Sequence, residues 1–470
     1  MTIMSKAEVL ANYVVTAKYE DLPADVIAHA KKIVMDNISC GLGGRKTLEG
    51  DVLLDIVKEM GGKPQATIIG NATRVSCEQA AQVNRVITNI LDYDDDCLNP
   101  NIGHMSSLLV PVALAIGEYA NASGKDLINA LVLGYEVIIR LREAVDPTEE
   151  VFLKSFEKID FSGLAFGATA VAGKLLGLNV EQMADAFGLT GYVRIKRVSD
   201  YNPNPKEGMA QWMKVTGGDA TIPSIHAVFL AQRGFSGDRT IFDQGRGYEV
   251  TVGSDRYDAT KLTVDLGKRY GMLRISFKYY SSCRLISSTV EATAAIASEN
   301  GIKAEDVEQV IVKVQKTMVD TMALYEPKYM IQAQFSVPYL VTMILMGEPT
   351  GPNWFTEDKL NNPRIKRFQH KIKLVEDPEA TKVGWGPKNV KWISTVEITT
   401  KDGRCLKKHV EHPKGERENP FTKQDHINKL RNMATWLGMK QSQINKLIQT
   451  LDRLEEPSSI AELTSLLVPD

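Results

Sequence analysis

The sequence is poor in cysteine and has no cysteines at metal-binding or redox spacing. Its 470 residues include five cysteines, an odd number without any CxxC pair. Cysteines that are few and far apart argue against a secreted disulfide scaffold and against a thiolate zinc site. We therefore expect a reducing, cytoplasmic environment for these residues, which are Cys40, Cys77, Cys97, Cys283 and Cys405.

Long apolar runs and a large net charge are also missing. No stretch reaches the roughly 18 apolar residues of a membrane span, and the N-terminal segment MTIMSKAEVLANYVV lacks the pattern of a signal peptide. The formal net charge is -2, from 56 basic and 58 acidic residues. We therefore expect no nucleic acid or membrane partner, and an anionic ligand must be held by local charges.

Fingerprints of common cofactors and nucleophiles are absent as well. The sequence holds no Walker A motif, no GxSxG elbow and no HExxH. Gly217 and Gly218 lack the spacing and the preceding strand of a dinucleotide site. We therefore expect neither an organic cofactor nor a bound metal.

What is present is an ordinary globular composition with strong helical patterns. The chain is 43% hydrophobic and 24% charged, and it is long enough for more than one core. Residues 106–141 are apolar nearly all round, which is typical of central buried helices, and residues 163–176 and 221–233 continue the pattern. From about residue 5 to 60 the apolar residues also recur mostly at helical spacing, and the glycine-rich run at residues 40–44 interrupts that pattern.

Strand patterns appear after residue 265. Val310, Val312 and Val314 follow strict alternation, and Asp402-Gly403 is a hairpin turn signal between two further alternating runs. Helical patterns lie between the strands, at residues 287–299 and 337–346, and short helices return after residue 422.

The sequence thus predicts a mainly α fold with two domains. We expect a large all-helical domain of residues 1–262 and 415–470, which the C-terminal tail completes. A smaller α+β domain of residues 263–414 is inserted into it.

The densest group of candidate functional residues is the segment LDYDDDCLNPNIGH, residues 91–104. Asp92, Asp94, Asp95 and Asp96 repel one another, which can raise the pKa of one or more of them into a useful range. The segment could supply an acid or a base, or bind a cation, although it lacks the spacing of an EF-hand. An acidic loop that caps a helix is the alternative.

Three single basic residues, His104, Lys278 and Arg284, are further candidates for the functional site. His104 precedes an apolar helix, where it could carry a proton at the edge of a cleft or lie hydrogen-bonded in the core. Lys278 and Arg284 stand in the hydroxyl-rich segment ISFKYYSSCRLISS. Arg284 suits a carboxylate, whereas Lys278 is either a base, if desolvated, or a solvated lysine at a strand end.

A cluster of basic residues lies in the helical half of the sequence. It forms the largest local positive patch there, and it is either a solvated face or an anion-binding surface. Its members are Arg194, Lys196, Arg197 and Lys214.

At these clusters the sequence resembles the MmgE/PrpD family of 2-methylcitrate dehydratases, cis-aconitate decarboxylases and iminodisuccinate epimerases. The resemblance runs nearly end to end. The segments that carry it, in the order of the family, are LDYDDD followed by GH, SGKDLINALVLGYEVIIRL, AGKLLGLNVEQMADAFGLTG, QWMKVTGGDAT, FKYYSSCR, and AQFSVPYLV before LMGEP. It implies a helical domain completed by the C-terminal tail, an inserted α+β domain, a homodimer, and an active-site cleft between the domains.

The resemblance also implies roles for particular residues. Asp92, His104 and Lys278 match the catalytic positions, with Asp92 able to orient His104. Residues expected to bind the substrate are Asp96, Lys158, Lys214, Tyr280 and Arg284.

Several positions depart from the family pattern. Asp96 replaces a threonine, Met105 a proline, Lys158 a histidine and Ser287 a further histidine, while Met213 stands where a lysine is usual, with Lys214 next to it. So many replacements in one cleft indicate that the substrate, and also the reaction, can differ from those of the family's other members.

Chemistry of this kind adds or removes a proton at the carbon next to a carboxylate. Such a reaction needs a positioned base, cations or N–H donors that stabilise the developing negative charge, and a second acid. We expect a hydro-lyase acting on a small di- or tricarboxylic acid. The alternatives are an epimerase or isomerase, a decarboxylase, and a non-enzymatic helical scaffold that uses its basic patch to hold a partner.

Overall fold

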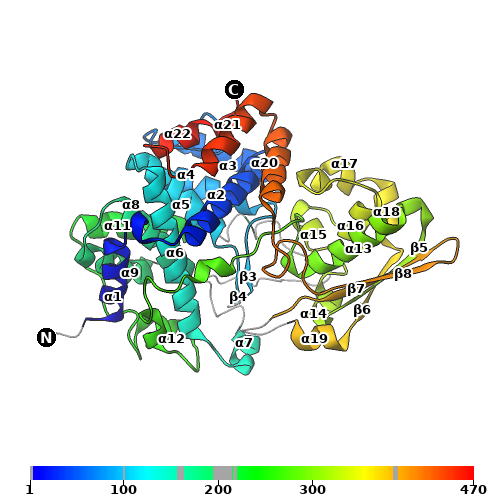
Figure 1. Cartoon of the computed structure of the whole chain (residues 1–470), viewed down its shortest axis with the longest axis horizontal. Coiled ribbons are helices and arrows are strands. Elements are labelled where there is room, and N and C mark those ends of the chain that lie inside the picture. The colour runs from blue at the N-terminus through cyan, green and yellow to red at the C-terminus, as the bar shows by residue number, and fades with distance from the viewer. Residues whose placement is uncertain (1–3, 99–100, 156–162, 194–213, 215–219, 385–389) are drawn as a thin grey trace.

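The computed structural model describes residues 4–98, 101–155, 163–193, 214, 220–384 and 390–470. Helices make up 59% of the structure and strands are few, so the prediction of a mainly α protein is confirmed. Figure 1 shows most helices gathered on one side and a small sheet with its own helices on the other. None of the helices in the described ranges is long and apolar enough to cross a membrane.

The helical side is built from both ends of the chain. Capping boxes at Ser5, Ser123 and Thr422 begin three of its helices, the first near the N-terminus and the last in the C-terminal tail. Its helices are α1 (Lys6–Thr16), α2 (Ala24–Arg45), α3 (Leu48–Met60), α4 (Cys77–Asn89), α5 (Ser106–Tyr119), α6 (Gly124–Val145), α7 (Glu149–Ser155), α8 (Gly163–Leu175), α9 (Val180–Val193), α11 (Thr221–Gln232), α12 (Gly247–Val252), α20 (Lys423–Leu437), α21 (Gln441–Asp452) and α22 (Ile460–Ser465).

Two nearly all-apolar helices form the centre of this side, as their sequence predicts. Almost every residue of α5 is buried, as is most of α6. Helix α8 packs against α6, and α20 from the C-terminal tail packs against α2. One apolar cluster therefore includes residues from Ala7 to Phe277 and again from Phe421 to Leu467.

The glycine-rich run does not interrupt a helix, contrary to the sequence prediction. Residues 40–44 lie inside α2, which is buried from Ile33 to Arg45. A Cβ added at Gly44 would lie 1.9 Å from the carbonyl oxygen of Ile87 in α4. The glycine is therefore needed for the close approach of two helix backbones and does not break the helix.

The second side contains a four-stranded mixed sheet. Strand β5 (Val307–Val314) is paired in parallel with β6 (Ile372–Glu376) and antiparallel with β7 (Ser394–Thr400), which pairs with β8 (Cys405–Val410). The predicted alternation of β5 and the predicted hairpin at Asp402-Gly403 are both confirmed, and Gly403 has a φ of 87°.

A second apolar cluster packs beneath this sheet. It includes the buried valines of β5 and β7 and runs from Tyr280 to Ile398. The helices of this side are α13 (Ser287–Asn300), α14 (Lys316–Thr321), α15 (Met330–Gln334), α16 (Val337–Leu345), α17 (Glu357–Leu360), α18 (Pro363–Gln369) and α19 (Pro378–Val383).

The chain passes from the first cluster to the second through a short buried segment. Phe277 belongs to the first cluster and Tyr280 to the second, so Lys278 stands where they meet. Where the chain returns, Phe277 N–H donates to the carbonyl of Gly415 at 2.9 Å. The domain limits at 262 and 415 stay a prediction.

The packing of α2 on α4 gives a stability prediction. We expect Gly44→Ala to lower the free energy of unfolding by roughly 1–3 kcal/mol, the usual cost of overpacking, because its methyl group meets backbone. Gly163→Ala is the matched control, since its added carbon would lie an ordinary 3.6 Å from its nearest neighbours. Chemical denaturation measures both, and equal stabilities would contradict the close approach.

Candidate active site

Two segments far apart in the sequence lie against each other beside the first cluster. The loop after α4 and the segment at residues 276–282 exchange hydrogen bonds between Asp96 and Ser276, at 3.0 and 2.8 Å. Ser282 N–H donates to the carbonyl of Asp92 at 3.2 Å. Asp92 itself has a φ of 48°, a left-handed conformation that aspartate tolerates better than most residues. The backbone thus aims the Asp92 side chain at the opposite segment.

Three cationic or protonatable side chains converge on one carboxylate oxygen. Lys278 Nζ lies 2.5 Å from Asp92 Oδ1, and Lys214 Nζ lies 3.1 Å from the same oxygen. His104 Nε2 is 3.5 Å from that oxygen and 3.5 Å from Lys214 Nζ. The structure therefore brings together Asp92, His104 and Lys278 with Lys214.

Asp94, and not Asp92, holds the histidine ring in place. Its Oδ1 lies 3.0 Å from His104 Nδ1, and Asn89 donates from Nδ2 to both Asp94 oxygens at 3.2 and 3.0 Å. An ionised carboxylate only accepts, so Nδ1 carries the proton and Nε2 is free to take one. Asp92 Oδ1 lies 3.5 Å from Nε2, so the orienting role expected of Asp92 falls mainly to Asp94 in this geometry.

Burial and charge oppose each other at these carboxylates. Burial disfavours the ionised form of Asp92, but Lys214 and Lys278 hold its pKa below its usual range. Burial likewise opposes ionisation of Asp94, and His104 holds the pKa of that carboxyl below its usual range. Both carboxylates are therefore ionised at neutral pH.

Lys278 is desolvated, yet it is held as an ammonium ion. Burial lowers its pKa, but Asp92 and Asp94 outweigh burial and raise the pKa above its ordinary value. The side chain is 1% exposed, whereas that of His104 is 29% exposed. The sequence-based idea of Lys278 as a desolvated base therefore does not suit this environment, because the lysine lacks a free electron pair at neutral pH.

Among the neighbouring aspartates, Asp95 has the raised pKa that their mutual repulsion predicts. Burial and the charge of Asp94 raise the pKa of Asp95 to about 8. Its oxygens accept from Ser106 N–H at 2.9 Å and from the Tyr135 hydroxyl at 3.0 Å. Asp95 therefore supplies an acceptor for the first backbone N–H of α5, the helix that follows His104.

The remaining predicted substrate ligands lie elsewhere or are already engaged. Asp96 accepts from the Cys97 N–H at 2.7 Å, and the buried ring of Tyr280 packs edge-on against Tyr279. Arg284 donates to the carbonyl of Phe277 at 3.1 Å and faces Glu416 at 3.4 Å. Lys158 lies outside the described residues, as do Arg194, Lys196, Arg197 and Met213.

Two groups of described residues have the composition of a metal site. The ligand atoms of Asp92, Asp94 and His104 lie within 4.8 Å of one another, as do those of His412, Glu416 and Glu418. In the first group Asp92 Oδ1 already faces two ammonium ions, which would repel a divalent cation. The prediction that no metal binds stays a prediction.

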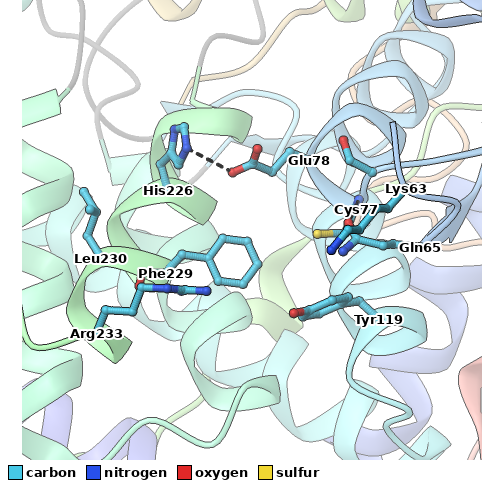
Figure 2. Close-up of a pocket in the computed structure, with 10 residues that line it drawn as sticks. Lys63, Gln65, Cys77, Glu78, Tyr119, His226, Phe229, Leu230 and Arg233 are labelled. Carbon is cyan, nitrogen blue, oxygen red and sulfur yellow. Dashed lines mark hydrogen bonds and ion pairs between the residues drawn. The ribbon is translucent and has the colours of Figure 1, made fainter. Parts of the chain in front are cut away.

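A separate pocket of about 440 Å³ opens between α4, α5 and α11 (Figure 2). Its histidine, His226, is 3.6 Å from Glu78, while the Arg233 guanidinium lies over the ring of Phe229. None of the residues around Asp92 lines this pocket. We place the candidate site at Asp92 because, within the described part of the chain, a positioned histidine and buried cations meet there.

Known proteins match the chain along most of its length. Residues 8–259 match the MmgE/PrpD N-terminal domain and residues 280–453 match the MmgE/PrpD C-terminal domain. A cis-aconitate decarboxylase of Aspergillus terreus is 23% identical over 475 residues, covering 94% of this chain and 92% of that protein. A mitochondrial 2-methylcitrate dehydratase of Yarrowia lipolytica is 23% identical over 413 residues, covering 83% and 76%.

The raised pKa of Asp95 predicts a pH-dependent contribution to stability. The folded state keeps the proton up to about pH 8, whereas the ordinary value is 3.8, so stability falls as pH rises between these values. Asp95→Asn abolishes this loss and can still accept from Ser106. We expect the variant to gain stability relative to the parent from pH 4 to pH 8 in denaturant titrations. Parallel pH profiles would rule out the shift.

Proposed function

The chain belongs to the MmgE/PrpD family, and we propose that it is a lyase that transfers a proton at the carbon next to a carboxylate. The substrate we propose is a small di- or tricarboxylic acid. The observation that carries the proposal is the arrangement of His104, which Asp94 orients through Nδ1 while Nε2 lies 3.5 Å from both Lys214 Nζ and Asp92 Oδ1. A decarboxylase and a dehydratase among its relatives support a lyase.

His104 is the proton carrier in this proposal. Its Nε2 takes the proton from the α-carbon, and the electron pair of the C–H bond moves toward the substrate carboxylate as an enolate-like anion. The ring is the most exposed member of the group, so a substrate can reach it without displacing Lys278. Asp94 stabilises the imidazolium that forms.

The two lysines stabilise negative charge. Lys214 and Lys278 share Asp92 Oδ1 in the structure, so both ammonium ions are fixed before a substrate binds. Fixed cations in a buried site need no reorganisation when charge develops on the substrate, which is the main source of electrostatic catalysis. Lys214, which also approaches His104, is placed to contact a substrate carboxylate as a point charge.

Dehydration is the reaction we favour, with decarboxylation as the second candidate. In dehydration the enolate-like anion expels a β-hydroxyl group, and a neighbouring acid such as Lys214 supplies a proton to it. Decarboxylation would instead release carbon dioxide and return a proton to carbon. The similarity to a cis-aconitate decarboxylase over 94% of the chain is the reason to keep it. The expected homodimer and cofactor independence remain predictions.

Proton transfer at carbon can be detected even without net turnover. We expect incubation in heavy water with a panel of citrate-like acids to introduce deuterium at an α-carbon, as followed by NMR. His104→Ala should lower the rate by roughly 10²- to 10⁴-fold, the usual size of a general acid–base contribution.

The matched control is His226→Ala, which removes another histidine outside the candidate site and should leave the rate unchanged. Absence of exchange or turnover with every acid would favour the non-enzymatic scaffold. A variant without His104 that retains the parent rate would remove it from the mechanism.

The two lysine ammonium groups that contact Asp92 predict that the activity does not require a metal ion. We expect exhaustive dialysis against chelator to leave the exchange rate unchanged, because Lys278 and Lys214 already neutralise this carboxylate. Metal analysis of the dialysed protein confirms removal. If activity disappears and one divalent ion restores it, Asp92, Asp94 and His104 become the candidate ligands.

A further inference from the structure

A second buried ion pair lies behind the candidate site. Lys429 Nζ on α20 is 2.7 Å from Asp36 Oδ1 on α2, and the side chains are 3% and 1% exposed. The two residues are 393 positions apart, and neither is among the candidate residues predicted from the sequence. The pair joins the C-terminal tail to the second helix of the chain.

The lysine also binds the backbone of both segments that carry the site. Its Nζ donates to the carbonyl of Tyr93 at 2.6 Å and to the carbonyl of Lys278 at 3.3 Å. Tyr93 directly follows Asp92. With Asp36 as the third acceptor, all three ammonium hydrogens have a partner. The Tyr93 ring adds a cation–π contact at 3.9 Å.

We propose that Lys429 and Asp36 are positioning residues that fix the separation of Asp92 and Lys278. This inference rests on the proposed function for its kinetic consequence. Lys429 touches neither the carboxylate of Asp92 nor the ammonium group of Lys278, and it acts through their backbones. Asp36 holds the ammonium group of Lys429 at the point where the two segments meet.

Stability alone does not explain this pair. Two buried charges are often no more stable than a well-packed apolar pair, since desolvation offsets their attraction. Helices α2 and α20 already share apolar contacts through the cluster that contains Leu430 and Met433. What apolar packing cannot supply is a donor for the buried carbonyls of Tyr93 and Lys278. The charged pair thus helps to order two irregular segments that are otherwise linked by the isolated bridge between Asp96 and Ser276 and not by a regular ladder.

Three variants separate positioning from folding. Lys429→Met leaves Asp36 buried without its cation, Asp36→Asn leaves the cation without its carboxylate, and the double variant removes both charges. We expect the double variant to fold and to exchange α-deuterium roughly 10²-fold more slowly than the parent, the scale of a 1 Å misplacement. The loss should appear in kcat, with KM within a few-fold, because Lys214 and His104 still meet the substrate.

A buried ion pair elsewhere in the same core supplies the matched control. Arg140 and Glu136 on α6 are 3.4 Å apart, and their side chains are 1% and 2% exposed. Arg140→Met should destabilise the protein while leaving kcat of the folded enzyme unchanged. If Arg140→Met lowers kcat as much as the double variant does, the effect is one of general stability and the proposal is overturned.

A crystal structure of the Asp36→Asn, Lys429→Met variant tests the same geometry without a substrate. We expect the contact between Lys278 Nζ and Asp92 Oδ1, 2.5 Å in the parent, to lengthen or break. An unchanged contact together with an unchanged kcat would overturn the proposal. If the parent exchanges no proton with any acid, the proposed function fails, and the crystal structure alone still decides whether the pair positions these residues.

Discussion

Asp92 makes the interaction on which the rest of the site depends. A carboxylate in a dry interior is stable only when cations and hydrogen bonds compensate for the water it has lost. Asp92 obtains this compensation from Lys278 and Lys214, which come from two other parts of the chain. The loop that follows α4, the segment around Lys278 and the side chain of Lys214 must therefore meet at one point. His104 lies beside them because the neighbouring Asp94 orients its ring.

Much of the fold could be predicted because regular elements leave a period in the sequence. The central helices α5 and α6, strand β5 and the hairpin at Asp402-Gly403 all appear where the pattern placed them. The sequence pattern predicts an interruption at the glycine run, which instead lies inside α2, and the reason is physical. A glycine that breaks a helix and one that admits a neighbouring backbone are identical in sequence, and only the carbonyl of Ile87 distinguishes them.

The site was predictable in part. Asp92, His104 and Lys278 stand in segments shared with a family, and the structure brings them together. Which aspartate orients His104 depends on backbone direction, which spacing does not reveal. Asp36 and Lys429 were missed because their partners are hundreds of residues away. The sequence did contain a sign of both residues, because each is a charged residue on the face of its helix that the apolar pattern predicts to be buried.

The hydrogen bond between Phe277 and Gly415 suggests how the sheet side of this protein could be replaced as a unit. The segments in which the chain leaves and re-enters the helical side are therefore in contact with each other. Segments attached in this way can be exchanged between relatives without rerouting the surrounding core. Lys278 follows directly after Phe277 at that contact. A graft that joins after Lys278 would place a new sheet side next to an unchanged set of charged groups.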